Sequence, residues 1–426
     1  MIKCCKSYAN YWHCLHVHLQ KYCHRKYFVN VAMIFNKNQT NTVSTAVQTA
    51  GQHALETIRG NLVTFADRYP DDTTVNHIYQ LRRAQNGFAE GDNYGWTTSF
   101  WPGELWLAYE LTGEKAFCSV AEQHIQSFVK RIDSKIDVDT HDIGFLYTLS
   151  CVAPWRINGN LLAKQAAIDA AQHLMTRFLD RIGIFQAWGK LNNPELRGNT
   201  IVDSLMNMPL LYWVSEITGD SRFAHAAYQH TQAVCNHMIR PDNTTYHTFY
   251  WDVETGLPLR GSTTQGYSAN SCWARGQAWA IYGLALNYRY THNQSFLDAA
   301  QCCADYFIDH LPADRVPYWD LMFSDGSGEE RDSSAAAIVV CGLHELLSYL
   351  PEGDRQQRYQ TALEAILMSL ISNYAPQTLS ESNALLLHSV YDKPKSIGVD
   401  EGSLWGDYFY LEALTRLLIP NWQIYW

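Results

Sequence analysis

The sequence predicts an all-α protein built from repeated helical hairpins, and three observations support this fold class. Apolar residues recur at helical spacing from about Val47 onward. The segment Trp106–Glu114 is echoed by Tyr212–Asp220, and in both an apolar helix ends at Thr-Gly, where glycine can adopt the left-handed C-cap conformation. Convincing strand patterns are confined to Tyr246–Asp252 and Leu257–Thr263, which predict one short β-hairpin.

The helical pattern continues as pairs along the chain. The turn of each echoed segment leads into a second helix, at Lys115–Ala121 and Ser221–Ala227, with a weaker copy at Gln294–Ala300. Further helices are expected at Leu161–Phe178, Ala278–Tyr290, Ala335–Leu350, Gln356–Ser372 and Tyr408–Leu418. About twelve helices, or about six pairs, would either stack as an open solenoid or close into a toroid with loops around its centre.

Composition narrows the function. The chain has 426 residues, a net charge of −10 and 13% aromatic residues. The negative charge argues against a nucleic-acid groove, and no apolar run is long enough to span a membrane. The aromatic content suits either a carbohydrate site or a well-filled core. The eleven cysteines mostly lie in apolar helical patterns, so reduced thiols and a cytoplasmic location are expected.

The N-terminal segment differs from the rest. Residues 1–55 hold six of the 32 basic residues and none of the 42 acidic ones. We expect residues 1–45 to be a basic extension outside the core and residues 46–426 to form a single catalytic domain. Cysteines and histidines in the extension show no regular ligand spacing, so no metal site is predicted there: Cys4, Cys5, Cys14, Cys23, His13, His16, His18 and His24.

Two aspartates stand out because each lies in an apolar run. Asp142 is in Thr140–Tyr147, and Asp203 is in Ile201–Asn207. A helix-capping role is one interpretation. The other is a buried pair whose raised pKa provides a protonated acid near neutral pH. Spacing alone does not show that the two side chains meet.

The stretch from Tyr246 to Trp279 is typical of a sugar site, because it combines aromatics, a histidine, an amide and an arginine that could clamp a carboxylate. The alternative is a hairpin that leads into a core helix. The sequence has no phosphate-binding loop, zinc helix, nucleophile elbow or dinucleotide fingerprint, and we expect neither a cofactor nor a metal.

Together the motifs resemble the unsaturated glucuronyl hydrolases of glycoside hydrolase family 88, from about residue 50 to 418. The motifs are His141–Tyr147, Gln186–Gly189, Asp203 with Asn207 and Pro209, Tyr246–Tyr250, Gln265–Gly266, Trp273–Trp279, Arg331–Ala335 and Trp405–Tyr408. The resemblance implies an (α/α)6 barrel. It also implies removal of a 4,5-unsaturated uronic acid from the non-reducing end of oligosaccharides made by polysaccharide lyases.

By the same resemblance, Asp203 matches the general acid and base, and Asp142 matches the supporting carboxylate. Arg275 is the expected partner of the uronate carboxylate, and the tryptophans are expected stacking walls. The residues expected to bind substrate are His247, Gln265, Arg275, Trp279, Trp188, Trp96 and His141.

Two features concern substrate preference. Thr98-Ser99 stands where many family members have Asp-Gly, so an acid expected at the edge of the site is missing. The loop Tyr391–Ser396 carries Lys393 and Lys395, which we interpret either as a reader of sulfate or carboxylate on the second sugar, favouring glycosaminoglycan fragments, or as a solvated loop.

Alternative functions are an unsaturated rhamnogalacturonyl hydrolase that acts on pectin fragments, a sugar epimerase, or a non-catalytic sugar-binding toroid. An epimerase would be expected to show more loop histidines than His141, His247 and His388. The sequence does not indicate the oligomeric state.

Overall fold

The computed structural model describes residues 40–194, 196–378 and 380–426. The chain divides into two compact units, Met1–Ser44 and Thr45–Trp426, and only the second is described below. The cysteines and histidines of the N-terminal extension lie outside the described residues. Within the described part, no helix is long and apolar enough to cross a membrane.

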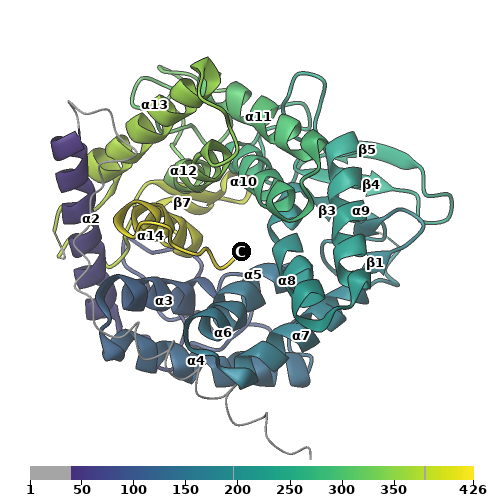
Figure 1. Cartoon of the computed structure of the whole chain (residues 1–426), viewed down its shortest axis with the longest axis horizontal. Coiled ribbons are helices and arrows are strands. Elements are labelled where there is room, and N and C mark those ends of the chain that lie inside the picture. The colour runs from purple at the N-terminus through teal and green to yellow at the C-terminus, as the bar shows by residue number, and fades with distance from the viewer. Residues whose placement is uncertain (1–39, 195, 379) are drawn as a thin grey trace, which may run out of the picture. The chain divides into compact units, whose positions relative to one another are not determined.

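The second unit is a double ring of helices (Figure 1). The inner ring consists of α3 (Phe100–Thr112), α5 (Ile143–Tyr147) with α6 (Ala153–Asn158), α8 (Met208–Thr218), α10 (Ala274–Thr291), α12 (Ser333–Leu347) and α14 (Leu404–Leu418). The outer ring consists of α4 (Lys115–Asp133), α7 (Leu161–Met175), α9 (Ser221–Met238), α11 (Gln294–Asp309), α13 (Asp354–Ser369) and α2 (Thr40–Asn61). This arrangement confirms the (α/α)6 barrel.

The two rings differ in burial as the sequence pattern requires. In α10, every residue from Ala274 to Asn287 is buried, whereas α4 buries only one face. A helix that is apolar all round must lie between other helices, and an amphipathic one can face water on one side. The inner helices therefore form the core.

Short left-handed turns join inner to outer helices. Gly113 after α3 has a φ of 72°, and Gly219 after α8 has a φ of 74°. Both values lie in the region where a side chain costs energy, which explains the repeated Thr-Gly. Gly159 ends α6 in the same way, and His292 takes this role after α10 with a φ of 52°.

The ring closes between the first and last inner helices. Helix α14 packs against α12 on one side and against α3 on the other. The chain then turns inward, so that the C-terminus lies near the centre of the ring in Figure 1. Trp426 is 1% exposed there, stacked on Phe409 and in edge contact with Phe145.

Within the described residues, three small antiparallel sheets form in the loops between the helices. The predicted hairpin forms as β4 (Thr248–Trp251) and β5 (Pro258–Ser262), and β3 (Asn199–Ile201) adds a third antiparallel strand. Two further pairs were not predicted from the sequence, because their strands are very short or lie in a polar loop. They are β1 (Phe178–Leu179) with β2 (Ile184–Phe185), and β6 (Ser389–Asp392) with β7 (Ile397–Glu401).

Contacts link the N-terminal ends of the inner helices. Ser99, just before α3, donates a hydrogen bond to the carbonyl of Phe145 in α5. Arg275 in the first turn of α10 pairs with Asp332, the N-cap of α12, and Ser333 then bonds the carbonyl of His388. The loops that carry the sequence motifs therefore meet at one end of the barrel.

Candidate active site

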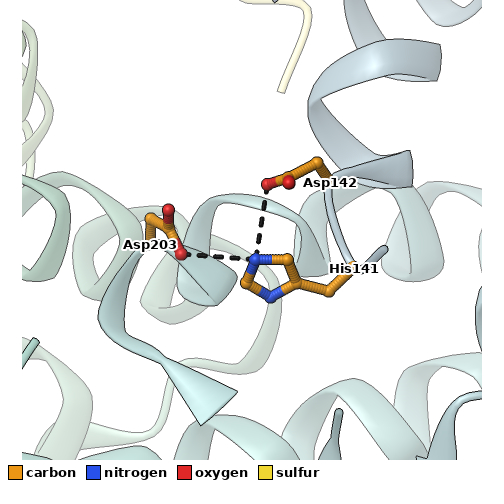
Figure 2. Close-up of side chains that lie close together, drawn as sticks. All are labelled: His141, Asp142 and Asp203. Atoms are coloured by element: carbon orange, nitrogen blue, oxygen red, sulfur yellow. Dashed lines mark ion pairs between the residues drawn. The ribbon is translucent and has the colours of Figure 1, made fainter. Parts of the chain in front are cut away.

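Asp142 and Asp203 meet on either side of one histidine. Figure 2 shows the His141 ring between the two carboxylates, with Nε2 3.3 Å from Oδ1 of Asp142 and 3.4 Å from Oδ1 of Asp203. The His141 side chain is 1% exposed, while those of Asp142 and Asp203 are 16% and 14% exposed. The structure thus brings together two aspartates whose proximity the sequence spacing did not show. Both side chains remain partly accessible to solvent.

Neither aspartate caps a helix with its side chain. Asp142 occupies the N-cap position of α5 but makes no capping hydrogen bond, and its Oδ2 accepts one from the hydroxyl of Thr140 at 2.7 Å. Asp203 lies in the first turn of a 3-10 helix, Val202–Met206, that follows β3. Both carboxylates are therefore available for chemistry.

Asn207 fixes the two aspartate-bearing segments to each other. Its Oδ1 accepts a hydrogen bond of 2.7 Å from the backbone N–H of Phe145, three residues after Asp142. The approach is so close that a Cβ on Gly144 would lie 2.3 Å from the Cα of Asn207. In the sequence Asn207 stands out only as part of a motif, and its position four residues after Asp203 is the one signal of this positioning role.

Burial shapes the protonation of the site. It raises the pKa of Asp142 to about 6, although the hydroxyl of Thr140 opposes the rise. Burial, followed by the charge of Asp142, raises the pKa of Asp203 well above its usual range, and Arg275 opposes this only in part. Burial also lowers the pKa of His141 to about 3, so that its ring is neutral. Of the pair, Asp203 is the carboxyl for which burial and a neighbouring charge both favour the protonated form.

His247 presents a ring nitrogen without a partner. Its backbone carbonyl accepts a hydrogen bond from Val202 at 3.0 Å, next to Asp203. Its Nδ1 accepts one from the backbone N–H of Thr264 at 3.1 Å, so that Nε2 carries the hydrogen. Nε2 is buried and has no hydrogen-bond partner among the described residues. Such a donor is placed to bind a polar ligand group.

Gln265 and Arg275 converge on the same backbone carbonyl. The Gln265 amide donates to the carbonyl of Tyr391 at 2.9 Å, and Nη2 of Arg275 donates to it at 2.6 Å. Tyr391 was not singled out from the sequence, because nothing in its local pattern marks it. It joins the loop before α14 to the segment before α10.

Arg275 differs from the sequence expectation of a free carboxylate clamp. Its guanidinium is buried, with Nη1 2.9 Å from Asp332 and also bonded to the carbonyl of Val390. It lies over the rings of Trp273 and Trp405, at 4.5 and 4.9 Å from their centroids. Both terminal nitrogens are therefore already held by the protein, so that Arg275 ties the loops together.

Trp279 also differs from expectation. It is 1% exposed and packs against Phe145 and Phe409 within the core. Trp279 lies more than one turn into α10 and faces the barrel interior, whereas a stacking wall needs an accessible ring face.

Trp96 and Trp188 keep partly exposed rings, as a stacking wall requires. The Trp96 indole donates to the hydroxyl of Tyr391 at 2.9 Å and packs 5.2 Å from the ring of Trp405. Trp188 pairs with Thr140 in an isolated β-bridge, close to Asp142. These two tryptophans therefore border the site.

Two features linked to substrate preference are placed differently from expectation. Lys393 pairs with Glu330, and Lys395 pairs with Asp392 at 2.5 Å, so neither is an isolated cation. Thr98 and Ser99 are fully buried and hydrogen-bonded to Asn93 and to the carbonyl of Phe145. Thr98 and Ser99 are therefore part of the barrel wall.

Two other acidic residues occur near the ends of inner helices. Asp332 caps α12, accepting a hydrogen bond from the backbone of Ser334. Asp407 does not cap: it lies inside the first turn of α14 and accepts hydrogen bonds from the Tyr79 hydroxyl and the backbone of Leu386. Asp407 lies inside the helix because α14 begins at Leu404 and not at Tyr408, where the sequence pattern predicted its start.

The chain is similar to known proteins over most of its length. An unsaturated chondroitin disaccharide hydrolase of Streptococcus agalactiae is 45% identical over 89% of this chain and 93% of its own length. The crystal structure of an unsaturated glucuronyl hydrolase from Bacillus sp. GL1, described as responsible for glycosaminoglycan degradation, superposes with a TM-score of 0.82 at 40% identity, covering 87% of this chain and 96% of the other.

A mutant of the Streptococcus agalactiae unsaturated glucuronyl hydrolase, crystallised with dGlcA-GalNAc6S, superposes with a TM-score of 0.79 at 42% identity, covering 95% of this chain and all of the other. The family model described as Glycosyl Hydrolase Family 88 matches residues 68–412. The chain is therefore a glycoside hydrolase and belongs to family 88.

Proposed function

We propose that this family 88 enzyme removes the 4,5-unsaturated uronic acid from the non-reducing end of glycosaminoglycan fragments made by lyases. The observation that carries the proposal is the meeting of the Asp142 and Asp203 carboxylates at His141, where burial raises the pKa of both. The names of the relatives, which specify unsaturated chondroitin disaccharides and glycosaminoglycan degradation, support the substrate class.

In the proposed reaction, Asp203 donates its proton to C4, and the electrons of the C4=C5 double bond form the new C–H bond. The positive charge that develops is shared by C5 and the ring oxygen. Water attacks C5 and returns a proton to the Asp203 carboxylate, which acts as the base in this step. The resulting hemiketal opens as the C5 carbonyl forms and the bond from C5 to the ring oxygen breaks. The former ring oxygen is now a hydroxyl on C1, so C1 is a hemiacetal. It collapses to an aldehyde as the bond from C1 to the glycosidic oxygen breaks, and the remaining sugar leaves as an alcohol that carries the hydroxyl proton.

Neighbouring groups support this chemistry in distinct ways. Burial, and after it the charge of Asp142, keeps the pKa of Asp203 high, which favours the protonated acid before substrate binds. The unpartnered Nε2–H of His247 donates to the ring or to the attacking water, with Gln265 beside it. Trp96 and Trp188 cover the sugar faces. Arg275 contributes positive charge from within the wall without leaving Asp332.

The activity is tested directly with lyase-made disaccharides, because hydration destroys the conjugated alkene and its ultraviolet absorbance. We expect loss of absorbance on unsaturated chondroitin disaccharides. A parallel arm with unsaturated rhamnogalacturonan disaccharide tests the pectin alternative. If the absorbance does not fall with any unsaturated uronide, the proposed hydration activity is refuted. The alternatives would then be a sugar-binding toroid or an epimerase.

Sulfate recognition by the Tyr391–Ser396 loop rests on Lys395 more than on Lys393. Lys395 is 61% exposed, whereas Lys393 is 28% exposed and lies between Glu329 and Glu330. We expect Lys395→Ala to lower the ratio of kcat/KM for a sulfated disaccharide to kcat/KM for the matched unsulfated one. The variant loses a cation that attracts the sulfate group, and because solvent screens this attraction the effect should be modest. Lys393→Ala serves as the matched control, and a ratio unchanged by Lys395→Ala would identify a solvated loop.

We also propose that residues 46–426 act as a single catalytic domain and that the enzyme works in the cytoplasm. All seven cysteines in the described part are free, at positions 118, 151, 235, 272, 302, 303 and 341. Free buried thiols are usual in a reducing compartment.

A further inference from the structure

The ring of His141 lacks the hydrogen bonds that a buried imidazole normally makes. Both of its nitrogens are buried and have no hydrogen-bond partner in the described part of the chain, and the residue is 0% exposed. Figure 2 shows Nε2 directed between the carboxylates of Asp142 and Asp203. Oδ1 of Asp203 is likewise buried without a hydrogen-bond partner. Three ligand-type groups therefore face one point.

Their spacing fits a metal ion. The three residues form the one group of histidine and carboxylate side chains in the described residues whose ligand atoms lie within 4.8 Å of one another. Nε2 is 3.3 and 3.4 Å from the two carboxylate oxygens. A tetrahedral Zn²⁺ with bonds of about 2.0–2.1 Å keeps its ligands about 3.3–3.4 Å apart. The imidazole nitrogen is thus already at the separation from each carboxylate that such an ion requires, and the two carboxylates offer ligand oxygens within 4.8 Å of each other.

We propose that His141, Asp142 and Asp203 form a reversible binding site for Zn²⁺ or a similar divalent transition-metal ion, and that the bound ion inhibits the enzyme. The donor set of one neutral imidazole and two carboxylates is typical of sites that hold this class of ion and leave further positions open. The partial exposure of both aspartates gives a small ion access from solvent.

No protein group in the described residues fixes the His141 ring as a resident metal site usually requires, which favours reversible binding. A histidine that holds a permanent metal almost always donates its second N–H to a carboxylate, carbonyl or water. Nδ1 of His141 has no such partner in the described protein. The proposed inhibition rests on the proposed function, in which Asp203 is the proton donor. An ion bound by both carboxylates would leave Asp203 without a proton to give to C4.

Binding is tested on the full chain with Co²⁺, whose ligand-field absorbance reports tetrahedral coordination. Cysteines and histidines elsewhere in the chain could also take up metal, so the relevant quantity is the difference between wild type and His141→Gln. We expect the wild type to bind one more Co²⁺ with oxygen and nitrogen ligands, without the thiolate charge-transfer band of a cysteine site. Asp203→Asn should lose the same ion, which keeps the test decisive if His141→Gln misfolds.

Equal Co²⁺ uptake and equal spectra in wild type, His141→Gln and Asp203→Asn would overturn the site. Inhibition is measured separately, as the rate of absorbance loss against Zn²⁺ occupancy. We expect activity to fall in proportion to occupancy and to return with a chelator. Binding without inhibition would overturn the inhibitory role. If no substrate is turned over, the metal titration still decides the site, so failure of the proposed function and failure of the metal site are distinguishable.

Discussion

Asp203→Asn is expected to lower kcat/KM on unsaturated disaccharides by about 10²–10⁴-fold, the usual contribution of a general acid and base. Asparagine has nearly the same shape as a protonated aspartic acid but has no acidic proton to deliver to C4. Because the wild-type carboxyl is already held in its neutral form, the substitution should not unfold the protein. The measurement is initial-rate absorbance loss, with a thermal melt to check folding.

Asp139→Asn provides the matched control for Asp203→Asn. Asp139 lies two residues before His141, and its side chain is 63% exposed, with only a distant ion pair to Arg177 at 3.9 Å. It should keep near wild-type activity. If Asp203→Asn retained activity within a few-fold of wild type while folded, the assignment of the proton donor would be wrong.

Asp142→Asn should move the alkaline limb of the activity profile to lower pH. The carboxylate of Asp142 raises the pKa of Asp203, so its removal lowers that pKa. The reaction needs protonated Asp203, and activity is lost as the pH rises through the pKa of that group. The limb should therefore move to lower pH. Activity at neutral pH should fall with it.

The measurement for Asp142→Asn is kcat/KM as a function of pH, compared with wild type. Burial remains in the variant and still raises the pKa of Asp203, so the limb should not move all the way to the range of an exposed aspartate. A variant that loses activity equally at every pH would indicate that Asp142 only positions the site. A limb that moves to higher pH would contradict the electrostatic role.

The sequence predicted most of the fold because its determinants are local. Apolar spacing defined the helices, and the Thr-Gly repeat defined turns that the structure shows at Gly113 and Gly219. The residues alone did not predict closure of the ring, because closure depends on contact between α14 and α3, which lie far apart in the sequence. That step required the family resemblance.

Within the active site, the sequence identified the two aspartates and His247 from their residue types and neighbouring residues. It did not show which cationic side chains already form ion pairs within the protein. Arg275 was expected to be free, yet Asp332, far along the chain, holds it. Lys393 is held by Glu330 in the same way. Ion pairs between distant segments leave no pattern in the local sequence. A cationic side chain within a sequence motif can therefore stabilise the fold and not bind substrate. Asn207 was underestimated for the same reason, since its partner Phe145 lies on another inner helix.

Closure of the ring has a consequence for the order of folding. The aspartates lie in the first half of the chain, but their burial depends on a wall whose last inner helix is α14 and whose interior includes Trp426 against Phe145. Domains generally fold as units as the chain is synthesised from the N-terminus. A nascent chain that ends before α14 would hold both carboxylates in water, with ordinary acidity. Catalytic competence should therefore appear only after the final segment has been made.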